Sequence, residues 1–158
     1  MAKAKPVWKK GRGKLGALDP LIGQWTTKQV NHRTGPNAPP LKMSCKRTFT
    51  RALRDTYVVL RAEWDFGGGA YLEDAYIGVD RDGKVHFWSF TSDGKNSDGV
   101  ITDASDLHPE AIAFEAQMPA GTARMAYWPD EDGGFHFVVE SKTKKGWNRF
   151  TEHHYILA

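Results

Sequence analysis

Six side chains in this sequence combine an apolar body with a cationic, imidazole, indole or hydroxyl tip. Small-molecule pockets usually have apolar and aromatic walls with a few placed polar groups, which such side chains supply. Two of the six are arginines, and a guanidinium suits a carboxylate or another anion on a ligand. We therefore predict a site for a hydrophobic or aromatic molecule, with an acid group as an option. The candidate ligand-binding residues are Arg47, Tyr76, Trp88, Arg124, His153 and Tyr155.

A filled interior is the competing interpretation of the same residues. The aromatic side chains then form an ordinary core, and the arginines lie at the surface or pair with Glu115 and Glu140. The sequence leaves both interpretations open. An interior packed solid by side chains would remove the basis for a ligand.

Catalysis in such a pocket is the second hypothesis. His153 and Tyr155 would act as an acid–base pair in an isomerase, cyclase or decarboxylase. Such a pair has to converge within hydrogen-bond distance and to show strongly perturbed pKa values. The recognisable motifs do not add to this hypothesis. The run 11–16 (Gly-Arg-Gly-Lys-Leu-Gly) matches the dinucleotide fingerprint but follows no strand, and Ser92 and Lys95 have an acyl-enzyme spacing within a predicted turn.

The six histidines predict no metal site, because no two have a spacing that presents both to one ion. The adjacent His153 and His154 should point to opposite faces of a strand. Spacing along the chain does not test a metal site whose ligands come from different strands. We assign no catalytic residue, no metal and no cofactor, and haem held by a late histidine is a disfavoured option.

Short strands must position these residues. Aromatic-rich segments are separated by turn signals roughly every ten to thirteen residues, and no long helical period is present. This rhythm predicts an all-β fold, an up-and-down antiparallel barrel of about ten strands. The predicted strands are 24–30, 41–50, 56–66, 70–80, 84–91, 97–103, 111–118, 122–128, 134–143 and 147–157.

Alternation is clear in strand 56–66, where Val58, Leu60 and Ala62 face one side. The last strand is mixed on both faces, and one face is predicted to carry Trp147, Arg149, Thr151, His153 and Tyr155. Polar groups on an apolar-lined face are typical of a partly hydrated, ligand-sized interior, and equally of a structural hydrogen-bond network.

The connections are short, and none has room for a long helix. Segment 15–22 allows at most one helical turn, because Gly16 and Pro20 interrupt it, and we expect it to close one barrel end. The connection 31–40 is a loop by its proline content.

Length and charge indicate one domain with a basic extension. The first 14 residues hold six of the 22 basic residues and no acid, so sixteen basic residues face nineteen acidic ones in 15–158, a formal charge of −3. We therefore predict a flexible basic arm over 1–14 and a single barrel domain over 15–158. Neither nucleic acid nor a membrane is predicted as a partner.

The single cysteine, Cys45, cannot form an internal disulfide and is expected to be buried. No apolar segment follows the basic residues as a signal peptide requires. These features predict a cytoplasmic protein.

The opening Gly23-Gln24-Trp25 resembles the Gly-x-Trp signature of the calycin superfamily, which includes lipocalins, fatty-acid-binding proteins and nitrobindin-like haem proteins. The runs 76–80 (Tyr-Ile-Gly-Val-Asp) and 87–90 (Phe-Trp-Ser-Phe) resemble more closely a bacterial lipocalin-like family. The resemblance spans about residues 20–157.

This resemblance implies an up-and-down barrel with a central pocket. It also implies that Trp25 packs beneath Arg149 as a structural plug. Nitrobindin-like proteins carry further glycines after the Trp and an axial histidine near the C-terminus. Here the sequence has Thr26-Thr27-Lys28 in place of those glycines, although His153 and His154 lie late in the last strand.

A third hypothesis is an interaction protein that uses the barrel exterior and the basic arm, for instance in a homodimer. A large contiguous apolar patch or a symmetric interface would favour it.

Overall fold

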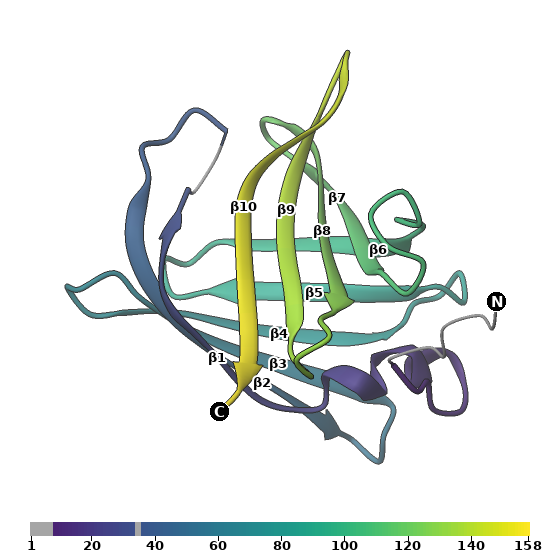
Figure 1. Cartoon of the computed structure of the whole chain (residues 1–158). Helices are drawn as coiled ribbons and strands as arrows, with labels where there is room; N and C mark the ends of the chain where they lie inside the picture. Colours follow the sequence, from purple (N-terminus) through teal and green to yellow (C-terminus); the bar gives the residue numbers. More distant parts are fainter. Residues whose placement is uncertain (1–7, 34–35) are drawn as a thin grey trace, which may run out of the picture.

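A computed structural model describes residues 8–33 and 36–158 and contains one closed antiparallel β-barrel (Figure 1). Each strand pairs with its sequence neighbours, and β1 closes the barrel against β10. The predicted fold class is confirmed. The elements are the 3₁₀ segment η1 (Lys14–Leu21) and β1 (Gly23–His32), β2 (Leu41–Ala52), β3 (Tyr57–Asp65), β4 (Ala70–Val79), β5 (Val85–Thr91), β6 (Asn96–Thr102), β7 (Ile112–Met118), β8 (Gly121–Pro129), β9 (Phe135–Thr143) and β10 (Gly146–Leu157).

Three hairpins of the barrel use the same kind of turn. In the β4–β5, β5–β6 and β8–β9 connections the fourth turn residue is a glycine, Gly83, Gly94 or Gly133, with φ between 76° and 86°. Its amide donates to the carbonyl three residues earlier in each case. Side chains with a Cβ adopt this left-handed backbone reluctantly, so glycine fixes where each strand reverses.

The segment η1 covers one end of the barrel (Figure 1). Leu18 and Leu21 are almost fully buried and belong to the main core. The indole Nε1 of Trp25 donates to the Leu21 carbonyl at 2.8 Å, which ties the end of η1 to the start of β1. The expected closure of one end by segment 15–22 is therefore present.

Trp25 does not pack beneath Arg149, so the pair implied by the calycin resemblance is absent. Trp25 lies inside the barrel, edge-on to Phe135 at 4.8 Å between ring centroids. Arg149 lies on the outer face, where its Nε contacts Glu140 at 3.0 Å and its guanidinium lies over the Trp128 ring.

A bulge in β10 accounts for this difference. The pairing register of β10 with β9 shifts between Arg149 and Thr151. Residues on the two sides of the bulge therefore exchange faces. Thr151, His153 and Tyr155 are buried, whereas Arg149 and Trp147 turn outward. The predicted single face from Trp147 to Tyr155 was wrong for its first two members, because strict alternation cannot anticipate an inserted residue.

Residues 1–7 of the predicted basic arm lie outside the described residues, as do residues 34 and 35 of the predicted loop. From residue 8 on the chain already contacts the barrel. Trp8 packs against the main core, and its amide donates to Glu110 Oε1 at 3.0 Å. Among the described residues, none of the helices has the length and apolar character needed to cross a membrane.

Gly134 is predicted to be a position where the barrel tolerates no side chain. A Cβ there would lie 2.0 Å from the backbone oxygen of Tyr155, which cannot move without breaking the β9–β10 pairing. We expect Gly134→Ala to lower the free energy of unfolding by about 3 kcal/mol. Gly68→Ala, which meets nothing within 4 Å, is the matched control and should change it by about 0.5 kcal/mol or less. Urea unfolding measures both, and equal effects would contradict the packing argument.

Candidate functional site

The barrel interior contains two adjoining cavities. The outer chamber, of about 750 Å³, lies at the end formed by the β1–β2, β7–β8 and β9–β10 connections and includes Pro36, Pro119 and Thr143 in its lining. The inner chamber, of about 160 Å³, lies toward η1 and is lined by Leu18 and Leu21. Five residues border both chambers: Glu73, Phe87, Phe114, Met125 and Val139.

Arg47 is the most unusual residue of the inner chamber. It lies on β2 between Trp25 of β1 and Ala62 of β3, and only 1% of its surface is exposed. Its Nη1 donates to the Tyr127 hydroxyl at 2.7 Å. Its Nε and Nη2 are buried and have no hydrogen-bond partner among the described residues. Unpartnered buried donors are rare and costly, and those of a charged group are costlier still.

Aromatic rings surround this guanidinium. Its Cζ lies 4.4 Å from the Phe137 centroid, 5.2 Å from Trp64, 5.3 Å from Tyr155 and 5.8 Å from Tyr127. Ring faces attract a cation but offer no oxygen to its N–H groups. An arginine side chain is not deprotonated in proteins. The guanidinium is therefore a permanent cation.

Glu73 is the carboxylate that faces the same space. It lies on β4 and borders both chambers. The register places Ala62 between Arg47 and Glu73, and this small side chain leaves room between the two charges. Glu73 Oε2 accepts a hydrogen bond from Ser89 Oγ at 2.6 Å, and the two free guanidinium nitrogens have no bond to it. The interior thus has a cationic and an anionic pole.

His153 and Tyr155 converge inside the barrel but outside both chamber linings. His153 Nδ1 lies 3.3 Å from the Tyr155 hydroxyl, and His153 Nε2 lies 3.1 Å from His32 Nδ1. Burial, with His32 and Arg47, lowers the pKa of His153 to about 3. Burial also raises the pKa of Tyr155 well above its ordinary value. His153 is therefore neutral, and Tyr155 is protonated.

In this arrangement His153 presents no free ring nitrogen to a haem iron. An axial ligand needs a free ring nitrogen that faces an open volume. Both ring nitrogens of His153 are engaged, one by His32 and the other by Tyr155. His154 points to the outer face, as expected for its neighbour in a strand.

Tyr76 and Trp88 lie on the outside of the barrel. They are direct cross-strand partners on β4 and β5. Tyr76 is 42% exposed, and Trp88 stacks on His86 with 4.8 Å between centroids. The inward positions of β4 are taken by Ala75 and Ile77 instead. The structure therefore does not bring these two predicted residues to the interior.

Arg124 also belongs to the outer face. It borders the outer chamber, but its Nε contacts Glu140 Oε1 at 2.8 Å and its Nη2 contacts Asp106 Oδ2 at 2.7 Å. Its guanidinium lies 4.3 Å from the Trp147 ring centroid. Only 4% of it is exposed. This arginine has its counter-charges, and Glu140 was one of the two partners that the filled-interior interpretation proposed.

The predicted set thus divides into Arg47, His153 and Tyr155 inside and the other three outside. Sequence reasoning missed Trp64, Tyr127, Phe137 and Glu73 as neighbours of Arg47. The alternation of strand 56–66 already placed Trp64 on the core face. The other three required the register between distant strands, which the sequence pattern does not contain.

Comparison with known proteins identifies a similar fold but no family for this chain. No family model matches this chain, and no curated protein matches it. A solved structure, that of Rv2717c from M. tuberculosis, aligns with a TM-score of 0.60 at 15% sequence identity, over 93% of this chain and 98% of that chain. At this identity the likeness establishes a shared barrel fold, and the calycin resemblance stays a prediction.

Proposed function

We propose that this chain is a small-molecule binding module whose interior holds an apolar or aromatic ligand with an acid group. The single observation that supports this proposal is the buried guanidinium of Arg47, with two donors that no described residue satisfies. The barrel fold is compatible with such a role.

The shape of the free donors favours a carboxylate. Nε and Nη2 form one edge of the planar guanidinium, and two parallel N–H groups on one edge match the two oxygens of a carboxylate. The other side of the guanidinium is held by Tyr127. An acid group entering the inner chamber would therefore find a cation already oriented by its neighbours.

The chambers indicate the rest of the ligand. The shared wall of Phe87, Phe114, Met125 and Val139 is apolar. The inner chamber is close to the size of a cavity that takes up benzene, about 150 Å³, and the outer chamber lies within the usual range for ligand pockets, about 300–1,000 Å³. A ligand with a compact acid-bearing end and a longer apolar body would occupy both.

The pKa shifts favour binding over acid–base catalysis. An effective acid–base pair has pKa values near the working pH. Here the pKa of His153 falls to about 3 and that of Tyr155 rises, so the base is too weak and the acid is too weak. Neither side chain borders a chamber in which a substrate would lie.

The test is a matched series of ligands that differ only in the end group. Decanoate and 2-naphthoate are titrated into the full chain by calorimetry, and so are decanamide and 2-naphthamide. A charge-assisted bidentate contact contributes about 1.5–3 kcal/mol, so the acids should bind roughly ten to a hundred times more tightly than the amides. Equal affinities of acid and amide, or no binding by either series, would overturn the proposal.

A further inference from the structure

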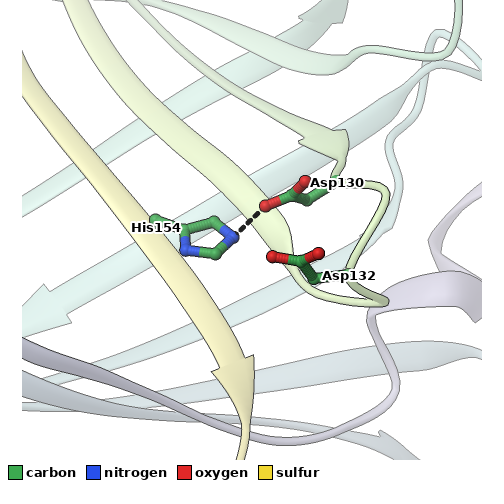
Figure 2. A group of neighbouring side chains, drawn as sticks. All are labelled: Asp130, Asp132 and His154. Atoms are coloured by element: carbon green, nitrogen blue, oxygen red, sulfur yellow. Dashed lines mark ion pairs between the residues drawn. The ribbon is translucent and has the colours of Figure 1, made fainter.

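A second cluster of polar side chains lies outside the barrel, at the turn between β8 and β9. Asp130 and Asp132 come from this turn, and His154 reaches it from the neighbouring strand β10 (Figure 2). One ligand-type atom from each of the three residues lies within 4.8 Å of the other two. His136 of β9 is the register partner of His154, and its Nε2 is 3.8 Å from Asp130 Oδ2.

The chain contains a second copy of this turn, which serves as an internal comparison. The pattern Asp-x-Asp-Gly-x-x-His occurs at 80–86 in the β4–β5 hairpin and again at 130–136. In the first copy both nitrogens of His86 are used, Nδ1 by Asp80 at 3.0 Å and Nε2 by Asp98 of β6 at 2.7 Å. In that copy the imidazole of His86 lies between the carboxylates of Asp80 and Asp98 and contacts both.

In the second copy the neighbouring strand supplies an imidazole instead of a carboxylate. Where β6 offers Asp98 to the first turn, β10 offers the imidazole of His154 to the second. His154 Nε2 is a buried atom without a hydrogen bond of normal geometry, although it forms an ion-pair contact with Asp130 (Figure 2). Two carboxylates and one imidazole therefore gather at one point, and His136 lies beside them.

We propose that Asp130, Asp132 and His154 bind a divalent transition-metal ion of the zinc type. Mixed carboxylate and imidazole donors suit zinc-like ions, whereas magnesium and calcium prefer oxygen alone. Donor atoms bound to one zinc ion are roughly 3–3.5 Å apart, given bond lengths of about 2.0–2.2 Å. The exposed side chain of Asp132 can make the remaining movement. The ion would join the β8–β9 turn to the last strand.

The experiment uses the full, untagged chain after chelator treatment. Zn²⁺ is titrated by calorimetry, and Co²⁺ is added separately to record its visible absorption. We expect one ion per chain, and affinity at least about tenfold lower for Asp132→Asn and for His154→Gln. The matched control is Asp82→Asn in the first copy of the turn, which should bind Zn²⁺ like the unaltered chain.

A thermal measurement provides a second readout. Zn²⁺ should raise the midpoint of unfolding of the unaltered chain and of Asp82→Asn equally, and that of Asp132→Asn by clearly less. Asp132 is exposed, so its variant is expected to fold. The proposal is overturned if Zn²⁺ does not bind, or if Asp132→Asn and Asp82→Asn bind it equally well, since the cluster is then only an ion-paired turn. A larger effect of Ca²⁺ or Mg²⁺ than of Zn²⁺ would also overturn it.

Discussion

Replacing Arg47 by methionine should abolish the preference for acids over amides and, at the same time, raise the free energy of unfolding of the ligand-free barrel by about 1–3 kcal/mol. The two effects have one cause. A buried guanidinium without an ion-pair partner favours the binding of an anion and lowers the free energy of unfolding.

The stability effect follows from what the guanidinium gives up on burial. Its Nε and Nη2 lose their water and gain no hydrogen-bond partner among the described residues. One cation–π contact at a desolvated site returns about 2 kcal/mol, and the bond to Tyr127 about 1 kcal/mol. The four ring contacts share one guanidinium and do not add up in full, so we expect the total gain to stay below the several kcal/mol that an unpaired buried charge costs. Methionine fills most of the same volume without a charge, so the folded state should gain.

The measurement combines urea unfolding with calorimetric titration of decanoate and decanamide. Since Arg47→Met leaves the Tyr127 hydroxyl without its donor, the double variant Arg47→Met/Tyr127→Phe should be at least as stable as the single one. A variant that keeps its acid preference, or that loses several kcal/mol of stability, would show Arg47 to be a structural partner of Tyr127 and not an anion site.

The number and limits of the strands were predictable because the turns between them contain recognisable residue types. Gly83, Gly94 and Gly133 lie in the turns at which the chain reverses between two strands. All ten predicted strands appear within a few residues of their expected limits. The position of the short segment over one end was predictable, but its length was not: at most one helical turn was expected, whereas η1 extends over eight residues through both Gly16 and Pro20. The strand limits and the place of this segment depend on residues that are close together in the sequence, so the sequence alone can predict them.

The distribution of side chains between the two faces was less predictable. Tyr76 and Trp88 are aromatic, yet they face outward, because Ala75 and Ile77 occupy the inner positions of β4. Both faces of β4 and β5 carry apolar residues, so alternation alone does not choose between them. The bulge before Thr151 then exchanges the faces of β10, which no pattern of residue types reveals.

The cluster of Asp130, Asp132 and His154 illustrates the same limit. Spacing along the chain correctly showed that His153 and His154 diverge, but it could not show that His154 meets His136. Cross-strand pairing depends on which strands are neighbours and on their register. Only the repeated Asp-x-Asp-Gly turn was visible in the sequence as a signal.

Arg124 provides the opposite case to Arg47 on the other side of the barrel wall, and Arg124→Met should lower the free energy of unfolding by about 3 kcal/mol. Arg124 is buried, although less deeply than Arg47, and its guanidinium contacts the carboxylates of Glu140 and Asp106. Its removal leaves Glu140, whose side chain is 5% exposed, with Arg149 alone. A buried carboxylate that loses a partner is strongly destabilising.

The same substitution is thus expected to act with opposite signs at two buried arginines, because Arg124 forms ion pairs with two carboxylates and Arg47 forms none with the described residues. Arg124→Met should change the acid preference of the interior less than Arg47→Met does, since the guanidinium of Arg124 is already paired with Glu140 and Asp106. Urea unfolding and the decanoate titration, carried out on both variants side by side, separate the two roles. If both variants lost stability alike, the missing partners of Arg47 would have to lie within the chain, and the barrel would need no acidic ligand to complete its charge.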